Sequence, residues 1–186
     1  SNKSIFTQNK KASKSNLKVI YFPSCITRSM GISKGYKSAM DLAKVTKVLL
    51  NRAGYEIIYP ENLNSLCCGM AFSSKGFVKA GKKASDRLEA ALTKASDGGK
   101  IPILCDMSPC LYTMKSNMNE RLKLYDQAEF IDKFLIDRLT IKPVDRKVAL
   151  FAVCSTKKME VDEALFNIAS KCAREVVRIE SNCCGF

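Results

Sequence analysis

Residues Cys67-Cys68-Gly69 recur as Cys183-Cys184-Gly185 in this 186-residue chain, and the rest of the sequence is arranged around the two copies. Adjacent cysteine side chains diverge from the backbone, so one pair can bind two irons of a cluster or two corners of a zinc tetrahedron. The following glycine allows the backbone to pass close to an inorganic centre or to adopt a positive φ. The repetition favours a metal site over two cysteine pairs packed in a core, where cysteine is also common.

The composition excludes several kinds of active site. The chain has no histidine, which rules out Ser-His-Asp and Cys-His catalysis and every histidine metal site. Its nine cysteines, an odd number, fit metal or redox chemistry better than a fully paired disulfide scaffold. A metal held mainly by sulfur is zinc or iron rather than magnesium or calcium.

The chain is strongly basic, with 31 Lys and Arg against 18 Asp and Glu and a net charge of +13. The lysines are scattered and are not interleaved with aromatic residues as in nucleic-acid-binding modules, so we expect no nucleic-acid partner. No apolar run approaches the ~18 residues of a membrane span, and the sequence shows no signal-peptide pattern. We therefore expect a globular protein.

Predicted strands alternate with predicted helices along the chain. Short apolar runs rich in β-branched residues predict strands at 17–22, 56–59, 101–105, 147–153 and 176–179. Apolar residues at helical spacing predict helices at 38–53, 74–97, 130–139 and 161–172. The second of these is predicted to carry Phe77 and Gly81 on its packed face and to end at Gly98-Gly99. Ser108 and Pro109 predict the cap and the first residue of a further helix, and the free amides of its first turn favour a thiolate at Cys110.

This alternation predicts an α/β fold with a parallel sheet flanked by helices. Residues 147–154 repeat the pattern of 18–25, so we expect two repeated lobes, at 17–142 and 143–186, with the second incomplete. Residues 1–16 are expected to form a linker or disordered tail, and the chain to be one domain of a longer protein. Ligands bind beyond the carboxyl ends of parallel strands, which is where Cys25, Cys105 and Cys154 are predicted to lie.

Three segments resemble a known family. They are residues 21–31 (Tyr-Phe-Pro-Ser-Cys-Ile-Thr-Arg-Ser-Met-Gly), 67–77 (Cys-Cys-Gly-Met-Ala-Phe-Ser-Ser-Lys-Gly-Phe) and 106–110 (Asp-Met-Ser-Pro-Cys). They are similar to the cysteine-rich CCG domain of heterodisulfide reductase B subunits, and most of all to the C-terminal iron–sulfur region of FAD-linked D-lactate dehydrogenases. The resemblance covers nearly all of residues 17–186. It departs at Met107, where the broad family motif has the first cysteine of Cys-x-x-Cys.

The resemblance implies an iron–sulfur electron-transfer domain of an FAD-dependent D-lactate (2-hydroxy acid) dehydrogenase, with a 4Fe-4S cluster in the full-length protein. FAD would be bound by a flavin domain, and a ferredoxin-like domain would be a second partner in the same chain. Electrons would pass from flavin toward quinone or another membrane acceptor, in the cytoplasm or at the inner membrane face. This region alone would not be catalytic, and no residue is assigned a catalytic role.

The resemblance also implies the metal ligands. The first site would comprise Cys25, Cys67, Cys68 and Cys110. Cys105 is either a further ligand that substitutes for the cysteine missing at position 107 or a core residue at a strand end. The second site has an incomplete set: Cys154, Cys183 and Cys184. Cys172 lies on an apolar helical face and is expected to pack rather than to bind metal.

Two other functions stay open at this point. Four thiolates also suit zinc, so the alternative is a four-cysteine zinc scaffold or docking domain without a redox role. The third possible function is that of a thiol–disulfide module. Separately, the isolated fragment is expected to carry no intact iron–sulfur cluster after exposure to oxygen. Arg28 and Lys75 flank the cysteine loops, and they either hold a substrate carboxylate, offset thiolate charge or lie on the surface.

Overall fold

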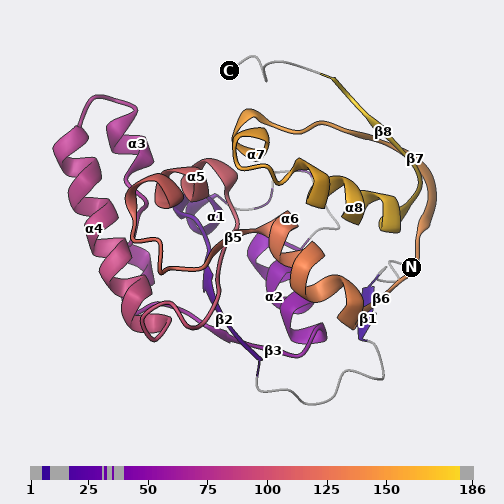
Figure 1. The fold of residues 1–186 in the computed structure, drawn as a ribbon, viewed down its shortest axis with the longest axis horizontal. Helices are drawn as coiled ribbons and strands as arrows, with labels where there is room; N and C mark the ends of the chain where they lie inside the picture. Colours follow the sequence, from indigo (N-terminus) through magenta and orange to yellow (C-terminus); the bar gives the residue numbers. More distant parts are fainter. Residues whose placement is uncertain (1–5, 9–16, 31, 33–34, 36–39, 181–186) are drawn as a thin grey trace.

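A parallel four-stranded sheet forms the centre of the protein. The structure is a computed structural model, and it describes residues 6–8, 17–30, 32, 35 and 40–180. The strands are β2 (Leu17–Phe22), β3 (Tyr55–Ile58), β4 (Ile103–Cys105) and β5 (Leu124–Asp126), and their order is β3-β2-β4-β5 with every pair parallel. Helices cover the sheet (Figure 1). The predicted α/β class, a parallel sheet flanked by helices, is confirmed.

The register of the sheet aligns three strand ends. Phe22 pairs with Cys105, and Cys105 pairs with Asp126, so β2, β4 and β5 finish in one row. The segments that leave this row begin with Pro23, Asp106 and Gln127. The expectation that cysteine-bearing loops share the carboxyl edge of a parallel sheet therefore holds for the loops after β2 and β4.

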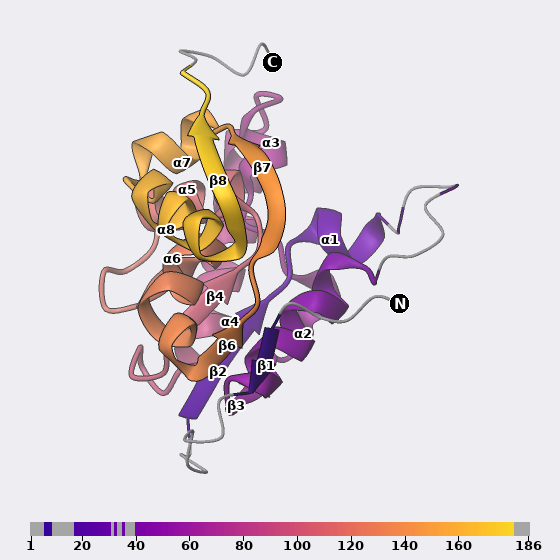
Figure 2. The same ribbon diagram turned by 90° about the vertical axis from the view of Figure 1, so that its right-hand side faces the viewer.

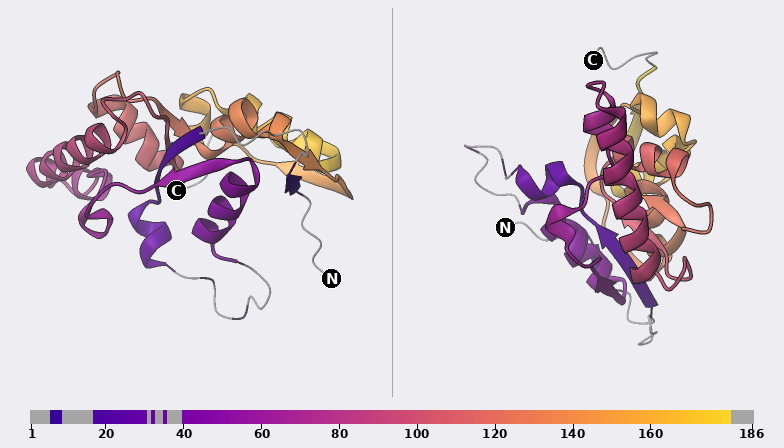
Figure 3. Two further views of the ribbon diagram at one scale, coloured as in Figure 1. Left: turned by 90° about the horizontal axis from the view of Figure 1, so that it is seen from below. Right: turned by 90° about the vertical axis from the view of Figure 1, so that its left-hand side faces the viewer.

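Two helical layers pack on opposite faces because successive side chains of a strand alternate between faces. On one face, Ile20 and Phe22 join a core with α4 (Val78–Ala95) and α5 (Ser108–Asn117). On the other face, Val19 and Tyr21 join a core with α2 (Leu42–Arg52), α6 (Gln127–Phe130) and η2 (Ile131–Leu135). Figure 3 shows these layers from two further directions.

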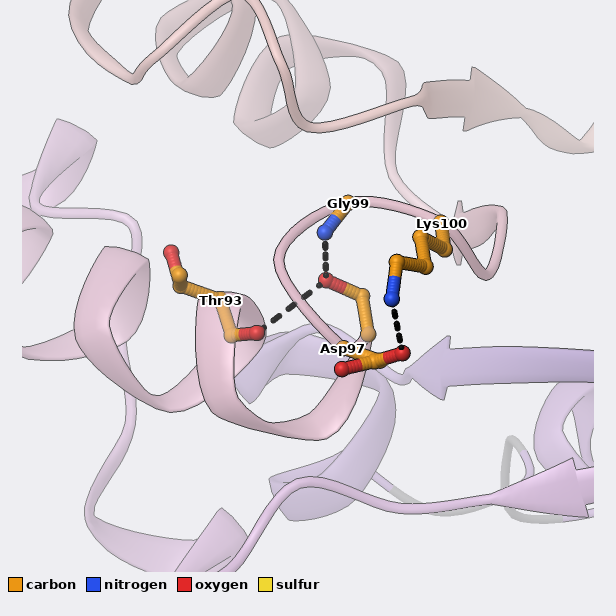
Figure 4. A network of polar contacts seen from close by, with 5 residues as sticks. Thr93, Asp97, Gly99 and Lys100 are labelled. Atoms are coloured by element: carbon orange, nitrogen blue, oxygen red, sulfur yellow. Dashed lines mark hydrogen bonds and ion pairs between the residues drawn. The ribbon is translucent and has the colours of Figure 1, made fainter.

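The end of α4 is closed by a compact turn, as Gly98-Gly99 predicted. The hydroxyl of the fully buried Ser96 accepts a hydrogen bond from the Gly99 amide at 2.9 Å and donates one to the Thr93 carbonyl at 3.4 Å (Figure 4). Lys100 contacts the Asp97 carboxylate at 2.8 Å across the same turn. The turn redirects the chain from α4 into β4.

Several predicted boundaries are wrong. The predicted helix 74–97 starts only at Val78, because Gly76 has φ +86° and separates it from the short α3 (Met70–Ser73). Phe77, assigned to the buried face of that helix, is 65% exposed. The predicted helix 130–139 consists of α6, η2 and η3 (Ile136–Arg138), and its last residue, Leu139, opens strand β6 (Leu139–Ile141). Strand β5 was not predicted.

Of residues 1–16, the structure describes only β1 (Phe6–Gln8), which pairs antiparallel with β6. For the other residues of this segment, the linker assignment stays a prediction.

A smaller strand–helix–strand unit follows β6. Strands β7 (Val144–Leu150) and β8 (Ala173–Arg178) are parallel, and α7 (Cys154–Lys158) and α8 (Asp162–Cys172) connect them. Figure 2 shows the pair with α8 beside it. That this unit is a truncated repeat of the first lobe stays a prediction, because residues 181–186 lie outside the described part of the chain. No described helix is both long and apolar enough to cross a membrane.

Candidate metal centre

A buried carboxylate holds the loop that carries Cys25. Asp106 follows β4, and it accepts hydrogen bonds from the Tyr21 hydroxyl and from the Ser24 amide, both at 2.8 Å. Ser24 is itself fully buried and caps the short α1 (Cys25–Ser29) by accepting from the Thr27 amide at 3.2 Å. Burial and the neighbouring Asp106 carboxylate raise the pKa of Tyr21 far above its ordinary value, so its hydroxyl stays a donor. Asp106 thus joins β4 to the first residues after β2.

Arg28 ties this loop to the segment before Cys67. Its guanidinium donates to the carbonyl of Leu63 at 2.5 Å, to that of Leu66 at 2.6 Å, and to that of Pro23 at 3.1 Å. Leu63 belongs to η1 (Leu63–Ser65), and Leu66 directly precedes Cys67. A planar fork of donors matches several carbonyls at once, which an ammonium cannot do. Arg28 is therefore not a plain surface residue, because it clamps two backbone segments, and the other two roles stay predictions.

Gly69 packs closely against a glycine of α4. It has φ +86°, as the sequence predicted, and precedes α3. A Cβ built on Gly69 would lie 2.2 Å from the backbone oxygen of Gly81, in the first turn of α4. The CCG loop therefore packs directly on the helix backbone through two glycines. Gly81, predicted on the packed face of that helix, is buried there.

Helix α5 brings Cys110 to the same edge. It begins at Ser108 with Met107 as its N-cap, so the prediction of Ser108 as the cap is wrong by one residue. The Ser108 hydroxyl instead donates to Asp126 at 2.7 Å, and Asp126 also accepts from the Ala128 amide at 2.8 Å. Cys110 lies in the first turn, as predicted. A second buried carboxylate, at the end of β5, thus fixes the start of α5.

The four cysteines predicted as ligands meet at this edge. Their thiols are electrostatic neighbours in a row, with Cys25 beside Cys67, Cys67 beside Cys68, and Cys68 beside Cys110. They come from three loops, those after β2, β3 and β4. Cys68 and Cys110 are buried, whereas Cys25 and Cys67 are half-buried.

Within this row, the surroundings of Cys68 favour its thiolate. Hydrogen bonds from the Cys110 thiol, the Met70 amide and the Cys67 thiol lower the pKa of Cys68 to about 6, against the opposing effect of burial. The pKa of Cys110 is raised because its thiol donates to Cys68 and because it is buried. The prediction that the start of α5 favours a Cys110 thiolate does not hold, because the neighbouring Cys68 and burial raise the pKa of Cys110.

The thiols of this donor set are the ligands that an iron–sulfur cluster takes. Among the residues described here, no three Cys, Asp or Glu side chains are placed to hold a single metal ion. A row of thiols can instead reach different metal atoms of a cluster, each of which needs its own thiolate. Backbone amides aimed at sulfur, from Gly69 to Cys67 at 3.4 Å and from Met70 to Cys68, stabilise ligating thiolates. The residues present therefore fit an iron–sulfur centre.

The remaining cysteines differ in their surroundings. Cys105 is completely buried at the end of β4, its thiol points to the Met107 carbonyl at 3.8 Å, and burial raises its pKa. Cys154 is half-buried at the first position of α7. Cys172 ends α8, and partial burial raises its pKa. Cys183 and Cys184 lie outside the described residues, so the second predicted set stays a prediction.

Comparison with known proteins decides the family. A model of the CCG cysteine-rich domain matches residues 19–115, which is more than half of the chain. The chain belongs to the CCG cysteine-rich domain family. The matched segment contains Cys25, Cys67, Cys68, Cys105 and Cys110 and ends before Cys154. The CCG match therefore covers the whole row of thiols.

One curated relative is similar over most of the chain. It is lactate utilization protein A of Bacillus licheniformis, 28% identical over 163 residues, which cover 78% of this chain and 66% of that protein. The chain thus spans less than two thirds of that relative's length. No solved structure matches the chain.

Sequence reasoning missed the residues that hold the CCG loops in place. Asp106 belongs to the 106–110 segment and directly follows a predicted buried strand, and that position is the signal that could have indicated its structural role. Asp126 is the last residue of β5, a strand that the sequence pattern did not predict. The targets of Arg28 are backbone carbonyls 35 and 38 residues further along the chain, for which the sequence carries no signal.

Proposed function

We propose that this CCG domain holds an iron–sulfur cluster on Cys25, Cys67, Cys68 and Cys110, and transfers electrons in the oxidation of lactate or a related 2-hydroxy acid. The observation that carries the proposal is the meeting of these four thiols, from three separate loops, at the carboxyl edge of the sheet. The name of the curated relative supports the link to lactate. When bound, the cluster would supply one-electron transfer at a potential set by its surroundings.

The protein's part is to place and shield the ligands. Arg28 and Asp106 fix Cys25 relative to Cys67, and Gly69 fixes Cys68 against α4. A largely apolar hollow of about 320 Å³ opens beside α1, and Ile26, Met30, Leu42 and Met107 line it together with Thr27 and Asp41. Low hydration and amide hydrogen bonds to sulfur are the means by which a protein tunes such a centre.

The finer assignment follows the family resemblance. In this proposal the chain works within an FAD-dependent D-lactate dehydrogenase, with FAD on a separate flavin domain and a ferredoxin-like domain between them. Electrons then leave toward quinone or another acceptor. The residues of the CCG domain bind the iron–sulfur cluster and shield it, and the flavin domain binds the hydroxy acid.

Anaerobic reconstitution with ferrous iron and sulfide tests the proposal. We expect iron and acid-labile sulfide in equal amounts, with broad visible absorption that dithionite bleaches. Replacing any one of the four ligands by alanine, for example Cys110→Ala, should abolish this absorption, whereas the matched control Cys172→Ala should retain it. Zinc alone in the protein purified without oxygen would assign it to the four-cysteine zinc scaffold. A protein that contains neither iron nor zinc but forms a reversible disulfide would instead be a thiol–disulfide module.

A further inference from the structure

The connection between α3 and α4 projects from the protein. We call residues 71–80 the α3–α4 hairpin; all ten are exposed, and Gly76 makes the turn with φ +86°. Three large apolar side chains are among them, Phe72 (43% exposed), Phe77 (65%) and Val78 (64%). The hairpin lies at the left-hand end of the molecule in Figure 1 and in the left view of Figure 3, away from the sheet.

The same hairpin carries positive charge only. Lys75 and Lys79 lie within it, and Lys83 follows one helical turn later. Within the described part of the chain, none of the three has a carboxylate within 4 Å, in contrast to Lys82, which contacts Asp86 at 2.8 Å. No Asp or Glu occurs from residue 62 to residue 85. Apolar tips surrounded by unpaired lysines therefore face solvent together.

We propose that the α3–α4 hairpin docks on the anionic surface of a phospholipid bilayer. Phe72, Phe77 and Val78 would enter the headgroup region, and the lysine stems would keep their ammonium groups at the level of the phosphates. Charge complementarity selects the anionic surface. The hairpin is too small for a stable protein interface, which takes about 20 to 30 residues on each side.

Docking would bring the cysteine edge close to the membrane. Cys68 lies two residues before the start of α3, and Gly69 packs on α4 at Gly81. The hairpin and the CCG loop are therefore one packed unit. Lipid bound at the hairpin would lie near the thiols of the CCG loop. The inference does not depend on the proposed function, because its test requires no metal.

The first test uses a fluorescent reporter, since the chain has no tryptophan. The Phe77→Trp variant of the 186-residue chain should show a blue-shifted emission with vesicles of phosphatidylcholine and phosphatidylglycerol in equal parts, and quenching when the acyl chains are brominated. Phosphatidylcholine alone should cause neither effect. The matched control Phe151→Trp, also at an exposed position, should respond to neither vesicle. An unchanged spectrum of Phe77→Trp with the anionic vesicles would overturn the proposal.

The second test separates the hairpin from the general charge of +13. The pairs Lys75→Glu/Lys79→Glu and Lys123→Glu/Lys142→Glu change the net charge equally, and all four lysines are exposed. In co-sedimentation with the anionic vesicles, the hairpin pair should lose about 30-fold or more in binding, and the control pair about threefold or less. Unfolding midpoints equal to the wild type would verify that both variants are folded.

Equal losses in the two pairs would show diffuse attraction only and overturn the proposal. A lipid-free dimer that the Phe77→Ser variant abolishes would assign the hairpin to a second copy of the chain, which would also overturn it.

Discussion

Replacing Gly69 by alanine should destabilise the protein through two separate effects. At φ +86°, an alanine costs about 1–2 kcal/mol relative to glycine. Its Cβ would also lie 2.2 Å from the Gly81 oxygen, whereas real contacts of this kind are essentially never under 3.0 Å. The backbone of α4 must therefore move by at least about 0.8 Å, and overpacking of this kind costs about 1–3 kcal/mol. The total is about 2–5 kcal/mol.

Gly76 is a control within the same chain. It also has φ +86°, but a Cβ there meets nothing within 4 Å, so Gly76→Ala should cost only the conformational part, about 1–2 kcal/mol. Urea unfolding of the two variants, reduced and metal-free, measures the difference in the free energy of unfolding. We expect Gly69→Ala to be less stable than Gly76→Ala by about 1–3 kcal/mol, and to take up less iron on reconstitution. Equal destabilisation would refute the close packing of the CCG loop on α4.

Three further predictions concern the residues around the thiols. Arg28→Lys should lower the free energy of unfolding by about 1–3 kcal/mol and reduce iron uptake, because an ammonium cannot reach three carbonyls, whereas Lys75→Ala should do neither. Asp106→Asn should cost about 1–3 kcal/mol in urea unfolding, because the buried site needs two acceptors and an amide offers one; no loss would contradict this network. Cys105→Ala should cost about 1 kcal/mol and leave iron uptake intact, because its thiol is packed in the core; loss of iron would make it a ligand.

The sequence determined the class of the fold and the identity of the cysteine loops. Strand 17–22 shows its type locally, since it is a short β-branched run that ends at proline. Glycine at position 69 allowed a positive φ to be expected, because this angle depends only on the backbone at that residue. The alternation of such strands with helices then placed Cys25 and Cys105 at one edge, because parallel strands share their carboxyl ends.

The tertiary structure decided what holds those loops and which sulfur carries charge. Strand β5 has only three residues, Leu124–Asp126, and exists because β4 pairs with it, so no local pattern revealed it. Arg28 binds carbonyls 35 and 38 residues away, and every residue has such a carbonyl, so the choice among them is made by packing. The pKa of Cys68 is lowered chiefly because the Cys110 thiol donates to it, and only the folded chain brings Cys110 next to Cys68. A local pattern specifies backbone conformation, whereas hydrogen-bond partners and electrostatics depend on distances that only the folded chain defines.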